Sequence, residues 1–142
     1  MANKLLYLLD LAVLAELSRP TGNRRVFTLY EQRQRQCALA APALYALLRG
    51  INGLHGGERQ TQLGVFADEL QRSGPQLLSF DGDAAQWLAR ERSERWRQER
   101  GWSVLEAQQT AIAATRELSL VTRNASAFAG IAELRVEDWF RP

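Results

Sequence analysis

The sequence predicts an α/β fold in which a parallel sheet is covered by helices on both sides. Short apolar or β-branched segments alternate with segments of helical periodicity along the chain, which is typical of parallel strands joined by helices. The first apolar segment, residues 4–9, is continuous and ends in Asp10, which indicates a central strand buried on both faces. The chain has 142 residues and no internal repeat, low-complexity tract or linker, so we expect a single domain over residues 1–142.

The other strands and helices follow from local composition and periodicity. The strands expected after the first are short and apolar or β-branched, and they cover residues 36–40, 76–80, 118–122 and 133–136. The helices expected between them cover residues 13–17, 21–33, 43–48, 63–70, 84–100 and 103–116.

Capping and breaking residues set the ends of these helices. Thr21 or Asn23 is the expected N-cap of the second helix, and Gly50 with Gly53 is expected to close the third, which Pro42 opens. Residues 73–75, Ser-Gly-Pro, end the fourth helix.

The last two helices have their own signals. Ala84, Trp87 and Leu88 share one face of the helix expected over residues 84–100, so only its first half is expected to pack on the core. Ser103 and Glu106 form the S-x-x-E capping box that begins the last helix.

The composition indicates a soluble globular protein, with 46% hydrophobic and 24% charged residues. The single cysteine, Cys37, has no partner for an intramolecular disulfide, which fits a reducing compartment, and we expect it to be buried. Asp10 and Glu16 interrupt the apolar start of the chain, which is too short and too charged for a membrane span and unlike a signal peptide. We therefore expect a cytoplasmic protein without membrane contact.

Arginine dominates the basic residues, although the net charge is only +2. The arginine clusters lie at Arg24, Arg25, Arg33 and Arg35 and along residues 90–100. Arginine forks match phosphate geometry, so RNA is an admissible partner. Along residues 90–100, however, the arginines alternate with glutamates, and a solvated, internally paired helix face explains that pattern more often than an RNA groove does.

Three polar residues are expected at the carboxyl ends of the strands, where functional groups gather in an open parallel sheet. Asp10 ends the first strand, Asn124 follows the strand 118–122, and Glu106 lies in the first turn of the helix before that strand. A carboxylate cluster at this edge suits Mg²⁺ or Mn²⁺, which activates water and stabilises charge on a phosphodiester. Each residue also has an ordinary structural role open to it: Asp10 as a helix cap, Glu106 as a member of the capping box and Asn124 as a turn residue. These residues alone do not establish an acidic cluster.

Four segments resemble motifs of VapC-like PIN domains, and they occur in the same order over nearly the whole chain. LLDLAVLAEL resembles LLDTNVLSEL, and ALYALLRGI is similar to the family's GELRRGI segment. SVLEAQQTAIAA resembles SVADAQIAAIA, and LVTRNASAFAGI resembles LVTRNVKDFEGI. A tryptophan near the end of the chain, here Trp139, is also usual in the family.

The resemblance implies a three-layer α/β/α sandwich, a metal-dependent endoribonuclease site, and often a homodimer whose antitoxin partner covers that site. By position, Asp10 matches the first metal-binding acid, and Glu106 stands where the third acid is normally aspartate. Asn124 keeps the position in the TRN motif, and Glu16 matches a glutamate common in this subgroup. The implied catalytic residues are thus Asp10, Glu106 and Asn124, and the implied ligands of Mg²⁺ or Mn²⁺ are Asp10, Glu106 and Glu16.

The departures from the family pattern fall on the same cluster. The second acid falls on Ala46, and the Thr-Asn pair after the first acid is Leu11-Ala12. The aspartate usual three residues after the TRN asparagine is Ala127. Loss of a direct ligand and of the groups that hold ligands in place weakens metal binding by about tenfold or more per group.

Two hypotheses then compete for this chain. The first is a toxin–antitoxin PIN protein that keeps the fold and the partner surface but cleaves RNA weakly or not at all, and the changed positions favour it. The second is an active metal-dependent endoribonuclease toxin neutralised by an antitoxin. A small-molecule binder is poorly supported, because no glycine-rich phosphate loop follows the first strand. The helix that carries Tyr45 and Ala46 is the expected homodimer contact.

Overall fold

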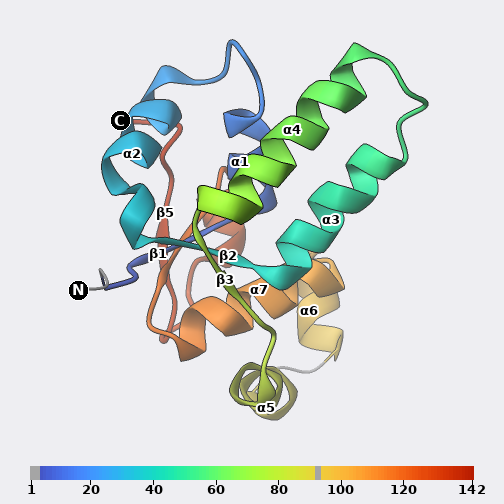
Figure 1. Ribbon diagram of the computed structural model, residues 1–142. Coiled ribbons are helices and arrows are strands. Elements are labelled where there is room, and N and C mark those ends of the chain that lie inside the picture. The colour runs from blue at the N-terminus through green and yellow to red at the C-terminus, as the bar shows by residue number, and fades with distance from the viewer. Residues whose placement is uncertain (1–3, 92–93) are drawn as a thin grey trace.

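A parallel sheet runs through the middle of the protein, as the alternating pattern predicts (Figure 1). The computed structural model describes residues 4–91 and 94–142, except for the side chains of residues 91, 94 and 95. In the described part the sheet has the order β3-β2-β1-β4-β5. Its strands are β1 (Tyr7–Leu9), β2 (Cys37–Ala40), β3 (Gln76–Leu78), β4 (Ser119–Val121) and β5 (Arg135–Glu137).

The first strand is the central one, as its continuous apolar run predicts. Leu8 of β1 is in register with Ala38 of β2 on one side and with Leu120 of β4 on the other. All three side chains are fully buried. Because the strands are parallel, their carboxyl ends meet at one edge of the sheet.

Helices cover both faces of the sheet, with α2 and α4 on one side and α5 and α7 on the other (Figure 1). The helices are α1 (Leu11–Leu17), α2 (Arg24–Arg33), α3 (Ala41–Asn52), α4 (Glu58–Ser73), α5 (Gly82–Glu91), α6 (Glu94–Arg100) and α7 (Val104–Thr115). Two short 3₁₀ helices, η1 and η2, cover Gln34–Gln36 and Ala125–Phe128. This arrangement confirms the predicted α/β/α sandwich.

Helix ends agree with the capping signals in part. Asn23, and not Thr21, is the N-cap of α2, because its side chain accepts a hydrogen bond from the Val26 N–H. Gly50 was expected to help close α3 but lies inside it, and the helix continues to its C-cap at Gly53. An interior glycine lowers helix stability by only about 1 kcal/mol, which the packing of α3 on the core overcomes.

The single helix predicted over residues 84–100 is wrong, since α5 and α6 are separate helices that run in different directions (Figure 1). Ala84 is buried, and Trp87 and Leu88 pack against the core, as predicted. Trp96 of α6 also packs against the core, so the expectation that only the first half does so is wrong. In α6, Arg100 donates hydrogen bonds to the carbonyl oxygens of Ala127 (3.3 Å) and Ala129 (2.7 Å), which lie outside the helix. The pairing of arginines with glutamates predicted along residues 90–100 falls in part on Arg92 and Ser93, which lie outside the described residues.

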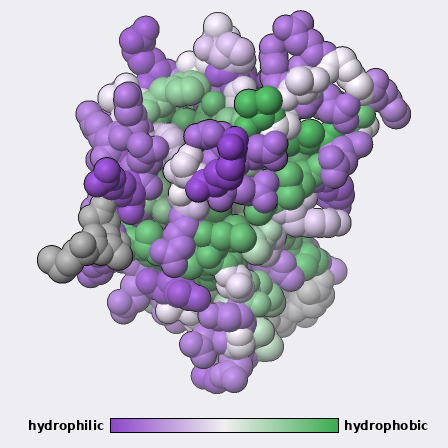
Figure 2. Space-filling model, viewed as in Figure 1, coloured by the Kyte–Doolittle hydropathy of each residue, from purple (hydrophilic) through white to green (hydrophobic). Residues whose placement is uncertain are grey.

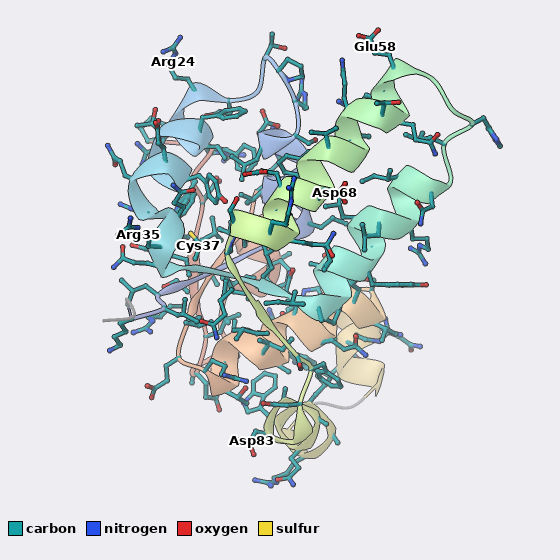
Figure 3. All side chains as sticks on the ribbon, viewed as in Figure 1. Arg24, Arg35, Cys37, Glu58, Asp68 and Asp83 are labelled. Atoms are coloured by element: carbon teal, nitrogen blue, oxygen red, sulfur yellow. The ribbon has the colours of Figure 1, made fainter. Side chains whose placement is uncertain are left out.

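Cys37 is buried at the start of β2, as predicted, and Figure 3 shows its sulfur between α2 and the sheet. Its thiol donates to the Arg33 carbonyl oxygen at 3.3 Å. The pKa of this thiol is raised to about 12, mainly because the thiol is buried. The thiol therefore stays protonated at neutral pH and is a poor nucleophile.

Several large apolar side chains remain on the surface. Figure 2 shows apolar side chains on the face that carries α3 and α4, with polar side chains around them. Across the described residues, the large apolar side chains that are exposed are Tyr45, Leu54, Val65, Leu77 and Val104. None of the helices in the described part of the chain has the length and apolarity that a membrane span requires.

Candidate functional site

A pocket of about 660 Å³ lies at the carboxyl ends of β1 and β4. Its walls come from the start of α1, from α3, from the start of α7 and from the residues after β4. We call it the strand-end pocket, and its polar lining residues include Asp10, Arg49, Glu106, Thr122, Arg123 and Asn124. The three predicted catalytic residues, Asp10, Glu106 and Asn124, therefore do lie around one pocket.

Asp10 is held by side chains from two other elements. The residue as a whole is nearly buried, with 9% relative exposure. Oδ2 accepts a hydrogen bond from the Thr122 hydroxyl at 2.6 Å, and Oδ1 accepts one from the Gln109 amide at 3.4 Å. Asp10 stands at the N-cap position of α1, but its side chain makes no capping hydrogen bond there. The carboxylate thus joins the end of β1 to the end of β4 and to α7.

Glu106 lines the pocket and also completes the predicted capping box. Its Oε1 accepts from the Ser103 N–H at 2.9 Å, while the Ser103 hydroxyl oxygen accepts from the Glu106 N–H at 3.1 Å. One carboxylate oxygen therefore already accepts from the N-cap residue at the start of α7.

Glu16 is not among the residues that line the strand-end pocket. Its side chain has 5% relative exposure. Oε1 lies 3.2 Å from Arg19 and 3.7 Å from Arg123, and Oε2 accepts from the Asn23 N–H at 2.5 Å. Glu16 therefore ties the α1–α2 turn together and neutralises nearby arginines.

The tight packing around Glu16 gives a direct test. A Cβ added at Gly22 would lie 2.6 Å from the Glu16 carbonyl oxygen and 2.6 Å from the Phe27 ring. We expect Gly22→Ala to lower the free energy of unfolding by about 1–3 kcal/mol in urea titrations. The control is Gly64→Ala in α4, where an added Cβ meets nothing within 4 Å and should stabilise the helix by up to about 1 kcal/mol. Equal losses in both variants would contradict the crowding at Gly22.

Three of the positions that depart from the family pattern give the pocket an apolar wall, whereas Ala127 does not line it. Leu11, Ala12 and Ala46 all line it, together with Leu105 and Phe128. The second acid of the family pattern would therefore face this pocket from α3, where the chain has a methyl group instead.

Thr122 and Gln109 were not singled out in the sequence, although they contact Asp10 directly. Thr122 has 1% relative exposure and Gln109 none, and no described residue donates a hydrogen bond to the Gln109 Oε1. The sequence carried one signal for Gln109. A glutamine stands out on an alanine-rich helix, because the buried positions of such a helix are usually apolar.

Two arginines bring positive charge to the same pocket. Arg49 is exposed, its guanidinium lies 5.2 Å from the Tyr45 ring centre, and within the described ranges it forms no ion pair. Arg123 has 59% side-chain exposure and lies 4.3 Å from the Phe140 ring centre. The lining thus carries two carboxylates and two guanidinium groups.

Several solved structures with this fold belong to toxin–antitoxin systems. One chain of the DNA-bound VapBC from Salmonella typhimurium aligns with a TM-score of 0.80 and 21% identity, over 95% of this chain and 98% of that chain. One chain of VapBC2 from Rickettsia felis, bound to a promoter DNA fragment, gives 0.74 and 18%, over 95% and 99%. One chain of FitAcB from Neisseria gonorrhoeae gives 0.73 and 24%, over 96% and 100%.

The chain therefore has the VapC-like PIN-domain fold, a three-layer arrangement around a parallel sheet. At these identities the likeness establishes the fold alone. No protein-family model matches the sequence, and no curated protein matches it. The homodimer contact on α3 stays a prediction.

Proposed function

We propose that this protein is the toxin-type member of a toxin–antitoxin pair, in which a partner protein covers the strand-end pocket and metal-dependent RNA cleavage has been lost. The fold supports the first part, because the structures that share it include VapBC and FitAB complexes. The free and buried Cys37 fits the reducing cytoplasm. The observation that carries the loss of cleavage is Ala46, which puts a methyl group in the wall of the strand-end pocket at the position of the second family acid.

A divalent cation fits the donors of this pocket poorly. Mg²⁺ requires about six oxygen ligands at about 2.1 Å, including one or two carboxylates that are free to bind it. Asp10 and Glu106 are the two carboxylates in the lining of the strand-end pocket, and Arg49 and Arg123 add two positive charges beside them, which repel a cation. Among the residues described, no three histidine, cysteine or acidic side chains gather where they could hold a metal ion. These observations support a pocket without a resident metal.

The second candidate is an active metal-dependent endoribonuclease, and one observation favours it. Asp10, Glu106 and Asn124 surround a single pocket at the edge of the sheet where such sites lie. In that case Asp10 and Glu106 would hold Mg²⁺ or Mn²⁺, which would supply an activated water for phosphodiester hydrolysis. Glu16 would first have to leave its contacts with Arg19, Arg123 and Asn23.

Metal titration separates the two candidates. We expect Mn²⁺ or Mg²⁺ at millimolar concentration to release no heat on mixing and to leave the Tm unchanged, because a ligand raises the Tm only if it binds the folded state. Structured RNA incubated with the protein and either metal should remain intact.

The matched control restores the missing acid. The double variant Ala46→Glu with Glu106→Asp places both family carboxylates at the pocket and is expected to gain a metal-dependent rise in Tm. The proposal fails if the unmodified protein shows a metal-dependent rise in Tm, or cleaves RNA, and Asp10→Asn abolishes that effect.

A further inference from the structure

The arginine cluster at Arg24, Arg25, Arg33 and Arg35 divides into two groups in the structure. Arg33 ends α2 and Arg35 lies in η1, where a positive charge suits the C-terminal end of the helix dipole. Arg33 also pairs with the Glu137 carboxylate at 3.6 Å. Arg24 and Arg25 lie in the first turn of α2, which holds no acid, so their charges oppose the dipole. Helix stability therefore does not explain the arginines at the start of α2.

These two arginines belong to a positively charged surface at the α1–α2 turn and the end of the chain. Arg24 points away from the protein (Figure 3) and makes no ion pair within the described residues. The Arg25 Nε donates to the Arg141 carbonyl oxygen at 3.0 Å, and across the described chain its other N–H groups make no hydrogen bond. Arg19, on the adjoining turn, has 53% side-chain exposure. We call Arg19, Arg24, Arg25 and Arg141 the arginine surface.

The acids beside the arginine surface are mostly buried. Glu16 pairs with Arg19 at 3.2 Å and has 5% side-chain exposure. Asp138 pairs with Arg141 at 3.6 Å and has 18% side-chain exposure. The other two arginines of the surface have no such partner in the described ranges. The charge that this surface presents to solvent is therefore positive.

A hollow of about 540 Å³ opens beside Arg24, between the α1–α2 turn and the outer side of α2. Its lining includes the Phe27 ring and the hydroxyls of Thr21 and Thr28, and neither hydroxyl makes a hydrogen bond within the described residues. Glu31, the acid of this lining, lies about two helical turns beyond Arg24, so the positive end of the hollow is at Arg24. The hollow shares no lining residue with the strand-end pocket.

The arginine surface and the hollow together hold the groups that bind single-stranded nucleic acid. Guanidinium forks and threonine hydroxyls donate to backbone phosphates. An unstacked base binds against an aromatic ring when a positively charged surface tracks its backbone. A duplex keeps its bases stacked inside and cannot use the Phe27 ring.

We propose that single-stranded nucleic acid binds the arginine surface, with backbone phosphates on Arg24 and Arg25 and one base against Phe27 in the hollow. This inference goes beyond the proposed function, because it assigns a second site on another part of the surface. Binding there needs no metal and leads to no cleavage.

The test is fluorescence anisotropy with labelled single strands of RNA and of DNA, titrated with the full-length protein in EDTA. Both strands should bind, and duplex DNA of the same length should bind about fivefold more weakly or less, because it offers no base for stacking. Binding should weaken as salt rises, with a slope of about −0.7 in the logarithm of the binding constant for each phosphate contact.

The double variant Arg24→Ala with Arg25→Ala removes the two phosphate contacts. It should weaken binding by about tenfold or more and reduce the salt slope by about 1.4. Its Tm should stay unchanged or rise, because the two arginines oppose the helix dipole. Thr28→Glu, at an exposed position, places a carboxylate in the hollow and should weaken binding by about tenfold through repulsion of the phosphates.

The matched control is the double variant Arg59→Ala with Arg72→Ala. It also removes two exposed arginines from one helix, here the two ends of α4, and so makes the same change in net charge. It should bind single strands as the unmodified protein does. Circular dichroism confirms that each variant is folded.

Four results would overturn the inference. These are the absence of binding at low salt, equal losses in the two double variants, a preference for duplex DNA, and displacement of the strand by polyglutamate at equal charge concentration. The last result would show an attraction of charge without recognition of a base. RNA cleavage that appears only with Mn²⁺ would defeat the proposed function, but not this inference if binding in EDTA still depends on Arg24 and Arg25.

Discussion

Replacing Asp10 with alanine is expected to lower the free energy of unfolding by about 2–4 kcal/mol. The Thr122 hydroxyl and the Gln109 amide are both buried and both donate to this carboxylate, and each buried donor left without an acceptor costs about 1–3 kcal/mol. Removal of a nearly buried charge recovers part of that loss, so the net effect is smaller than the sum. Urea unfolding in the presence of a chelator measures it without any contribution from metal.

The sign of this effect separates a structural carboxylate from a metal ligand. In a metal-binding cluster the acids repel one another when no metal is bound, so removal of one leaves stability unchanged or raises it. Here the acceptor role dominates, and we expect a clear loss. An Asp10→Ala variant as stable as the unmodified protein would contradict this account and would favour the nuclease hypothesis.

Two controls localise the loss. Glu106→Gln keeps an acceptor for the Ser103 N–H and is expected to change stability by less than about 0.5 kcal/mol, as surface substitutions usually do. Thr122→Val removes the hydroxyl that donates to Asp10. In a double-mutant cycle, Asp10→Ala and Thr122→Val should show a coupling energy of at least about 0.5 kcal/mol, because the two side chains are in contact.

The edge of the sheet where the site lies could be predicted because it follows from periodicity. A continuous apolar run before Asp10 places the first strand in the centre, and parallel strands bring their carboxyl ends together. Asp10 and Asn124 therefore had to lie near one another once β1 and β4 were neighbours.

The hydrogen bonds within the site could not be predicted in the same way. Gln109 and Thr122 are 99 and 112 residues from Asp10 along the chain, and their contacts depend on how α7 packs across the ends of β1 and β4. Glu16 shows the same limit. Its position in the family motif suggests a metal ligand, whereas in the structure its carboxylate accepts from the Asn23 N–H and lies beside Arg19 and Arg123.

Replacing Trp139 with alanine is expected to lower the free energy of unfolding by about 3–5 kcal/mol. Trp139 has 1% relative exposure, and its ring meets the Tyr7 ring edge-on at 5.4 Å between centres. Its indole N–H donates to Glu137 at 3.2 Å. Because Tyr7 begins β1 and Glu137 ends β5, the indole fastens the end of the chain to the central strand. For a chain of this length the loss corresponds to a fall in Tm of about 10 °C.

Arg33 tests whether this loss comes from ring burial or from charge. Its guanidinium lies 5.5 Å from the Trp139 ring centre and 5.3 Å from that of Tyr7, and 3.6 Å from the Glu137 carboxylate. Arg33→Met keeps the aliphatic stem and should cost only about 1 kcal/mol, because half-exposed cation–π contacts and ion pairs are weak. Thermal unfolding of both variants decides the question. If Arg33→Met costs as much as Trp139→Ala, the charge and not the buried indole holds the C-terminal segment on the sheet.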